Sequence, residues 1–197
     1  NIYRTSHPPI FPAGYVYVEY DKPHLHDFPT AHQVTHVNSA IPFRADEDKV
    51  MISLFSTKKI DSFGNRNSIG GSDGKVLLID RHDKHASNVV IFDGLFNPHS
   101  VTWFGKNKYG FVESSAGIVK IFSVDKVDNT PHSIKVIDFN GLPDYVEEKP
   151  WLQTMTVDND IIYIVNTQRS ATEIIDINNR IRAEIKIVNP DIVIHSL

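Results

Sequence analysis

Apolar residues in this chain recur at every second position within short runs, and clusters of polar residues separate the runs. The runs are rich in β-branched and aromatic residues and cover 50–55, 75–80, 89–92, 118–122, 133–138, 161–165 and 173–176. Polar clusters at 46–49, 105–108 and 158–160 supply the turns between them. A period of two with turns at such spacing predicts short strands of an antiparallel meander. No long stretch has a helical period, so we expect little helix.

The predicted strands repeat in groups. Opening segments at 35–40, 97–102 and 151–155 each precede further strands, and the groups close near Gly94, Gly141 and Pro190. These closing positions lie about 47 and 49 residues apart, close to the ~40–50 residues of a four-stranded propeller blade. The sequence therefore predicts an all-β, propeller-like array of four-stranded antiparallel blades at roughly 32–94, 95–141 and 142–190. Residues 1–31 are expected to form an N-terminal strand and a histidine-rich lead-in to this single domain.

Three or four blades raise the question of how the ring closes, since closed propellers have at least about four blades. One possibility is that the chain is part of a longer propeller, and another is that two copies close a ring together. An open β-sandwich of similar strands is a third. The runs at 15–20 and 191–195 are candidates for a pairing that closes or joins rings.

Composition removes several classes of function. The net charge is −4 and the 20 Lys and Arg residues are scattered, so no basic stripe predicts nucleic-acid binding. The apolar runs are far shorter than the roughly 20 residues of a membrane span. The chain has no cysteine, which excludes disulfides, thiolate metal sites and thiol nucleophiles. Neither this nor the absence of a visible signal segment selects a compartment.

Histidines are the unusual feature of the composition, with ten in the chain. His24, His26, His32 and His36 fall in one segment, where the spacing can place imidazoles on one face. Gln33 follows His32 where a zinc protease motif needs a glutamate, so that class of protease is excluded. The alternative is that these histidines are exposed loop residues bonded to the backbone.

Repeat position gives a second reason to select certain residues. The innermost strands of propeller blades begin near the central channel, so equivalent residues converge there. We expect His36, His99 and Gln153 at comparable places, with Asn38 two residues beyond His36. Imidazole nitrogens and amide oxygens suit a divalent metal or a polar substrate. We therefore predict His32, His36 and His99 as metal ligands and Asn38 and Gln153 as substrate-binding residues, the alternative being structural roles at blade starts.

Two charged residues are candidates for catalysis. Glu113 ends a strand of the middle blade, where a carboxylate could act as a general base or ligand. Arg169 follows another strand and could clamp an anionic substrate. Solvated turn positions are the alternative for both residues.

The segment Asn97-Pro-His-Ser-Val101 resembles the Pro-His-Gly/Ser blade openings of virginiamycin-B-lyase and gluconolactonase-like propellers, within the superfamily of six- and seven-bladed propellers. The segments 50–53, 70–71 and 76–80 are more distantly similar to a blade of selenium-binding proteins. These families use central His, Glu or Asn residues, often with a metal, for lyase, lactonase or oxidase reactions. The metal-binding acid at the start of gluconolactonase-type chains and the selenium-binding cysteine have no match here.

The first functional hypothesis is a propeller enzyme whose histidine-lined central site holds a divalent metal. It would be a hydrolase or lyase that acts on a carbohydrate, a lactone or a similar small polar substrate. The alternative is a non-catalytic propeller that binds glycan or protein. A third possibility is an interaction domain whose blades complete a ring with another segment or a second copy, which predicts an obligate oligomer.

Overall fold

The structure is a computed structural model that describes residues 37–55, 72–82, 88–140, 150–178 and 182–186. These residues form three four-stranded antiparallel sheets, and no α-helix occurs among them. The prediction of an all-β chain built from four-stranded antiparallel blades is confirmed. The expected strands at 15–20 and 191–195 lie outside the described residues.

Each sheet is a simple meander in chain order. The first sheet contains β1 (Val37–Pro42), β2 (Lys49–Leu54), β3 (Gly74–Asp80) and β4 (Asn88–Leu95). The second contains β5 (Pro98–Trp103), β6 (Lys108–Glu113), β7 (Ile118–Val124) and β8 (Pro131–Asp138). The third contains β9 (Leu152–Asp158), β10 (Ile161–Asn166), β11 (Ala171–Asp176) and β12 (Arg182–Lys186), with a 3-10 turn, η4 (Thr167–Arg169), after β10.

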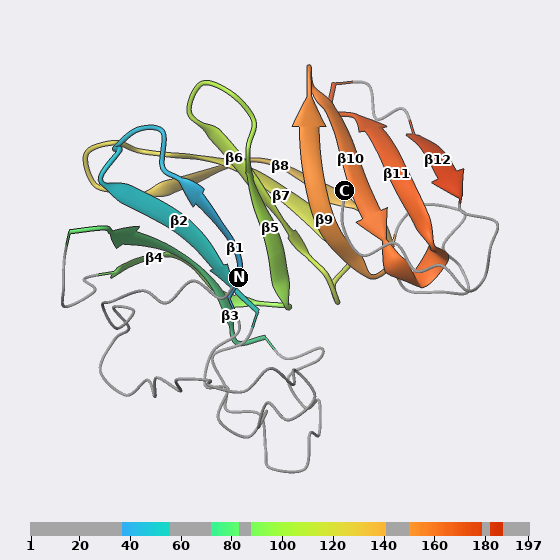
Figure 1. The fold of residues 1–197 in the computed structure, drawn as a ribbon, viewed down its shortest axis with the longest axis horizontal. Helices are drawn as coiled ribbons and strands as arrows, with labels where there is room; N and C mark the ends of the chain where they lie inside the picture. Colours follow the sequence, from blue (N-terminus) through green and yellow to red (C-terminus); the bar gives the residue numbers. More distant parts are fainter. Residues whose placement is uncertain (1–36, 56–71, 83–87, 141–149, 179–181, 187–197) are drawn as a thin grey trace, which may run out of the picture.

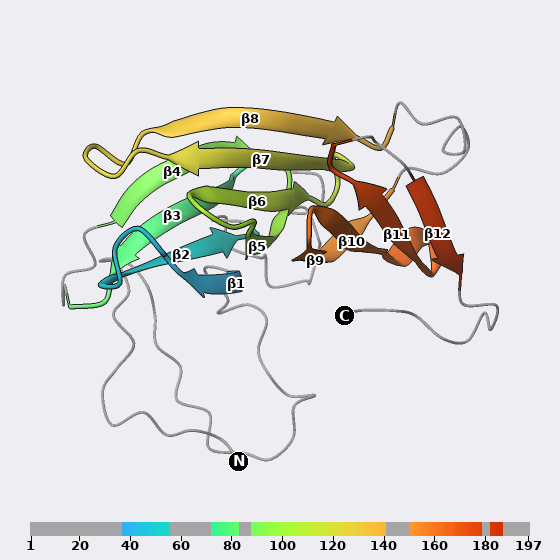
Figure 2. The same ribbon diagram turned by 90° about the horizontal axis from the view of Figure 1, so that it is seen from above.

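The sheets stand side by side in chain order and fan out from their first strands (Figures 1 and 2). β1 contacts β5, and β5 contacts β9. Figure 2 places these three strands along one side of the array and β4 and β8 along the other. We call β1, β5 and β9 the inner strands, because a propeller blade presents its first strand to the ring axis.

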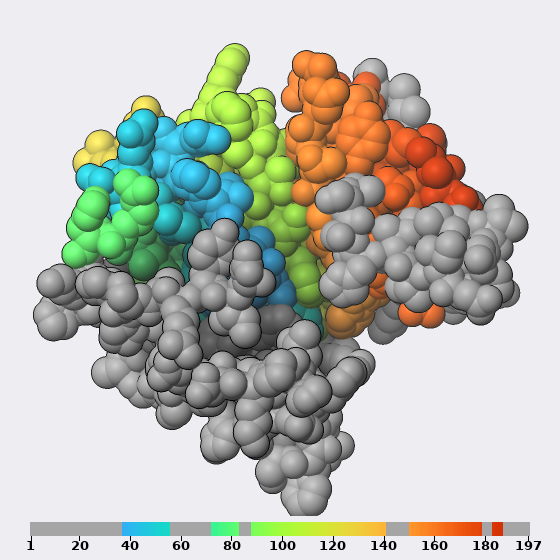
Figure 3. Space-filling view, viewed as in Figure 1, coloured from blue at the N-terminus to red at the C-terminus, as the bar shows by residue number. Residues whose placement is uncertain are grey.

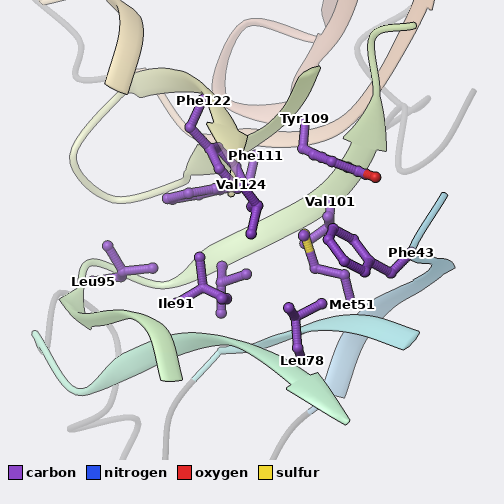
Figure 4. Close-up of a cluster of buried hydrophobic side chains, with 11 residues drawn as sticks. Phe43, Met51, Leu78, Ile91, Leu95, Val101, Tyr109, Phe111, Phe122 and Val124 are labelled. Carbon is purple, nitrogen blue, oxygen red and sulfur yellow. The ribbon is translucent and has the colours of Figure 1, made fainter. Parts of the chain in front are cut away.

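The first seam, between the first and second sheets, is rich in aromatic side chains (Figure 4). Phe122 lies 5.8 Å from Phe111 and 6.0 Å from Tyr109 between ring centroids, and Phe43 lies 5.4 Å from Tyr109. Burial raises the pKa of the Tyr109 hydroxyl, which accepts a hydrogen bond from the backbone N–H of Arg44 at 3.1 Å. Offset and edge-on ring pairs of this kind add to the hydrophobic stabilisation of the seam.

The second seam, between the second and third sheets, is mainly aliphatic. Its fully buried side chains come from β6, β7, β9, β10 and β11 and include Val112, Val119, Ile121, Leu152, Met155, Ile162 and Ile164. Alternate residues of the middle strands therefore fill one seam or the other, as the period of two along the sequence requires.

Serine hydroxyls join the inner strands across both seams. Ser39 Oγ accepts a hydrogen bond from the backbone N–H of Val101 at 2.8 Å, across the first seam. Ser100 Oγ accepts one from the backbone N–H of Met155, also at 2.8 Å, across the second. The two links have the same form, so Ser39 and Ser100 occupy the same position in successive inner strands.

Candidate functional site

The candidate site lies at the end of the array where the inner strands begin. β1, β5 and β9 begin opposite the last residues of β2, β6 and β10, because the strands are antiparallel. Of the predicted site residues, this end carries Asn38, His99, Gln153, Glu113 and Arg169. Figure 3 shows the surface of the inner strands, with β1 in blue, β5 in green and β9 in orange.

Strand register identifies the equivalent residues in the three sheets. Pro98 pairs with Glu113 at the end of β6, and Leu152 pairs with Asn166 at the end of β10. His99 and Gln153 therefore occupy the same position in β5 and β9. The serine links place Asn38 there in β1, since Asn38 precedes Ser39 as His99 precedes Ser100. Asn38, two residues beyond His36, is therefore the counterpart of His99 in β1, and His36 itself lies outside the described residues.

His99 is held by its own sheet. Its Nδ1 lies 2.6 Å from Ser114 Oγ and 3.1 Å from the carbonyl oxygen of Asn97. A carbonyl only accepts hydrogen bonds, so we assign the ring proton to Nδ1 and the lone pair to Nε2. The ring also meets Phe55 edge-on, with centroids 5.3 Å apart. The imidazole is thus fixed in orientation and tautomer, as a proton acceptor or ligand must be.

The backbone beside His99 is strained. Ser100 has a φ of 51° although it is not glycine, and the pairing of β5 with β6 is irregular between His99 and Thr102. Non-glycine residues in this region are uncommon and cost about 1–2 kcal/mol. The Ser100 hydroxyl offsets part of this cost, because it bonds both the backbone N–H of Met155 and, at 3.0 Å, its carbonyl oxygen.

The two amides at the equivalent positions differ in their surroundings. Asn38 Nδ2 donates a hydrogen bond to the carbonyl oxygen of Pro98 at 3.2 Å, so this side chain spans the first seam. Gln153 Oε1 is enclosed, and no described residue donates a hydrogen bond to it. A buried acceptor without a partner costs about 1–3 kcal/mol, which a ligand or water at this point would recover.

Glu113 is buried with both carboxylate oxygens engaged. Oε2 accepts a hydrogen bond from the backbone N–H of Phe96 at 2.8 Å, and Oε1 lies 2.5 Å from Lys120 Nζ. The Lys120 ammonium also lies 5.9 Å from the centre of the Phe111 ring. These contacts tie β6 to β7 and to the segment that leads into β5.

Arg169 ends η4 and pairs with the third sheet's last strand. One of its guanidinium nitrogens lies 2.9 Å from Glu184 Oε2, and both side chains are largely shielded from solvent. The guanidinium thus already has a carboxylate neighbour within the chain.

Of the predicted metal ligands, only His99 falls in the described part of the chain. His32 and His36 lie outside it. Among the described residues, no three His, Asp or Glu side chains gather as a metal would require. The described residues therefore do not by themselves fit a divalent metal, although His99, Asn38 and Gln153 offer nitrogen and oxygen donors at one repeat position.

The sequence analysis did not select Ser114 or Ser100 as site residues. Both act through contacts that depend on register and on a bulge, and the alternation of apolar residues carries no signal for either.

Comparison with family models found no match, and no curated protein matches the chain. Among solved structures, a calcium-binding protein, regucalcin, from Agrobacterium tumefaciens is 15% identical with a TM-score of 0.53, covering 78% of this chain and 46% of that one. A luciferin-regenerating enzyme is 14% identical with a TM-score of 0.61, covering 83% and 49%. The periplasmic gluconolactonase of Pseudomonas aeruginosa is 9% identical with a TM-score of 0.53, covering 79% and 42%.

These likenesses establish the fold. The chain shares the β-propeller fold, as the sequence predicted, and no family is assigned. It spans about half the length, or less, of the solved structures that it matches. The described residues contain no helix that is long and apolar enough to cross a membrane.

Proposed function

We propose that this chain is part of a propeller hydrolase that acts on a small polar substrate of the lactone or carbohydrate type. The substrate would bind where the inner strands begin, between Asn38, His99 and Gln153. The likeness to a gluconolactonase supports this choice of substrate class. A lyase reaction on a related substrate is the neighbouring possibility.

The observation that carries the proposal is the repeat position that these three residues share. Three adjacent inner strands each present a polar side chain at the same level: an amide, an imidazole and a second amide. One of them, Gln153, has an enclosed oxygen that no described residue satisfies. Polar groups that converge from separate strands, with one acceptor left for a ligand, are typical of a small-molecule site.

In this proposal His99 is the proton acceptor. Its Nε2 takes a proton from water, the water oxygen bonds to the lactone carbonyl carbon, and the ring C–O bond breaks. The proton then passes to the leaving ring oxygen, which yields the open hydroxy acid. Ser114 and the Asn97 carbonyl hold the imidazole for this step. Gln153 and Asn38 orient the substrate.

A divalent metal remains part of the proposal as a cofactor to be tested, with His99 as its one described histidine ligand. Regucalcin, a structural neighbour, is a calcium-binding protein. A metal here would need donors beyond the described residues, such as His32 and His36, so no step above depends on it. Glu113 and Arg169 remain predicted catalytic residues, and their carboxylate and guanidinium contacts favour a structural contribution.

The experiment is a hydrolysis assay with a panel of sugar lactones. Turnover is monitored as the acid released at constant pH. We expect turnover by the full chain and a fall in kcat of about 10²–10⁴-fold for His99→Ala, the usual contribution of a general base. Gln153→Leu should instead raise KM about tenfold, since it removes a substrate hydrogen bond worth about 1.4 kcal/mol. The metal content of the same samples is measured in parallel.

Matched controls come from exposed residues of the same types. His132→Ala in β8 and Gln168→Leu in η4 should leave turnover and metal content unchanged. If no lactone is hydrolysed, or if His99→Ala behaves like His132→Ala, the proposal fails. Metal that persists in His99→Ala would exclude His99 as a ligand.

A non-catalytic propeller that binds glycan or protein is the second candidate. It is favoured by the absence of a carboxylate among the three residues that share the repeat position. Glycan binding that Gln153→Leu weakens, without any turnover, would support this candidate over the hydrolase.

A further inference from the structure

The middle sheet buries both of its faces, whereas each end sheet has a second face with no described sheet against it. On the middle sheet, Tyr109, Phe111 and Phe122 fill the first seam, and Val112 and Ile121 fill the second; all five are fully buried. The outer faces of the first and third sheets repeat these positions. We call them the first and last end faces.

The first end face matches the side of the middle sheet that fills the first seam. Its residues are Val50, Ile52, Leu54, Leu77, Ile79 and Val90. Ile52 stands two residues before the end of β2, as Phe111 does in β6, and Val50 pairs with Ile79 as Tyr109 pairs with Phe122. Phe111 is fully buried, whereas Ile52 is half-buried and Val90 is 47% exposed; Leu54 and Leu77 on the same face are buried.

The last end face matches the side of the middle sheet that fills the second seam. Its residues include Tyr163, Val165, Ile174 and Ile185, of which Val165 is fully buried and Tyr163 and Ile174 are half-buried. Ile185 pairs with Thr172 as Ile137 pairs with Val119, so Ile185 and Ile137 are equivalent. Ile137 packs against the core of the second seam, whereas Ile185 is 59% exposed.

The two end faces are therefore of the two kinds that pack together at each seam. A first end face could pack against a last end face in the way that neighbouring sheets pack at the two seams. The chain also spans 46%, 49% and 42% of the three propellers described above. Two sets of three sheets would make a ring of about six, within the range of about four to eight seen in propellers.

We propose that a second copy of this chain closes the ring. The two copies are related by a two-fold axis along the channel, and the first end face of each packs on the last end face of the other. Both new seams are identical, as a closed two-fold assembly requires. The second copy also brings its own Asn38, His99 and Gln153 to the channel. The inference rests on the end faces and does not depend on the proposed function.

The mass of the full chain in solution is the first test. Light scattering should give twice 22.3 kDa, with dissociation only on dilution. A folded chain that remains at 22.3 kDa at every concentration would overturn the proposal and would point to a longer chain as the source of the missing sheets.

Charge variants test which faces meet. Val90→Lys on the first end face and Ile185→Lys on the last change side chains that are 47% and 59% exposed, so both variants should fold. Each variant alone should be mainly monomeric. Both seams of a two-fold dimer contain the substituted face, so either lysine would be buried in both seams. Ile52→Lys and Ile174→Lys are the second pair, checked for folding by circular dichroism.

Mixing the two variants gives the decisive result. A dimer of Val90→Lys with Ile185→Lys retains one seam with no substitution, so association should return on mixing. If like faces met instead, each variant alone would still dimerise through its unchanged face, and the proposal would be overturned. Val127→Lys, in a turn where the side chain is 93% exposed, is the control and should remain dimeric.

Discussion

The second and third sheets place different chemistry at the same pair of positions. In the second sheet, Glu113 at the end of β6 pairs with Lys120 on β7. In the third, Asn166 at the end of β10 donates a hydrogen bond at 3.1 Å from its Nδ2 to Glu173 Oε1 on β11. The carboxylate has moved from the second strand to the third, and an amide has replaced the lysine as its partner.

One contact is common to both sheets. The backbone N–H of Phe96 donates to Glu113, and the backbone N–H of Trp151 donates to Asn166 Oδ1 at 3.3 Å. Each side-chain oxygen thereby fixes the segment that leads into an inner strand. The first sheet carries Leu54 and Leu77 at the equivalent places. The oxygen contact therefore recurs in two sheets, while the charge beside it varies.

The largest effect is expected from giving the third sheet a second carboxylate. Asn166→Asp would set two carboxylates together, with Glu173 fully buried. We expect a loss of about 3–5 kcal/mol in the free energy of unfolding at pH 7, because a second negative charge would be added beside a buried carboxylate. Protonation of one of the two carboxylates would relieve their repulsion, so the deficit should shrink as the pH falls.

Urea unfolding at pH 7 and pH 5 measures this effect. Asn159→Asp, in the exposed turn between β9 and β10, is the control and should change stability by well under 1 kcal/mol. Equal and small losses for the two variants would contradict the equivalence of Asn166 with Glu113.

A smaller effect is expected from removing the cation of the second sheet. Lys120→Met leaves the Glu113 carboxylate buried without its ion pair. Because Lys120 is itself 29% exposed, solvent screens part of the loss, and we expect about 2–3 kcal/mol. Lys108→Met, at an exposed position of β6, is the matched control in the same unfolding experiment.

The smallest effect is expected when the second sheet is made to resemble the first. The double variant Glu113→Leu/Lys120→Leu copies Leu54 and Leu77 and should lose less stability than Lys120→Met, since an apolar pair often replaces a buried ion pair at little cost. Thermal unfolding measures the difference. Lactone hydrolysis retained by the double variant would contradict a catalytic role for Glu113.

The sequence could predict the strands and their grouping, because apolar alternation and turn clusters report on local structure. It could also select His99 and Gln153, which follow the repeat directly. It placed His36 instead of Asn38 beside them, because apolar alternation does not fix the register between one inner strand and the next.

Contacts between strands were harder to predict. Glu113 meets Lys120, and Arg169 meets Glu184, only for one register of the paired strands. A shift of one residue would turn these side chains to opposite faces. Alternation shows that a strand exists and which residues share a face, but it does not show which residue of the next strand lies opposite.

The serine links between inner strands provide a natural readout of sheet separation. The amide protons of Val101 and Met155 are held by hydroxyls of the neighbouring sheet, Ser39 and Ser100. Their exchange with deuterium should therefore require two sheets to part, even where each sheet stays intact. The exchange rate of the Val101 amide would report the separation of the first and second sheets, and that of the Met155 amide the separation of the second and third. Two resonances would therefore monitor how the three sheets separate.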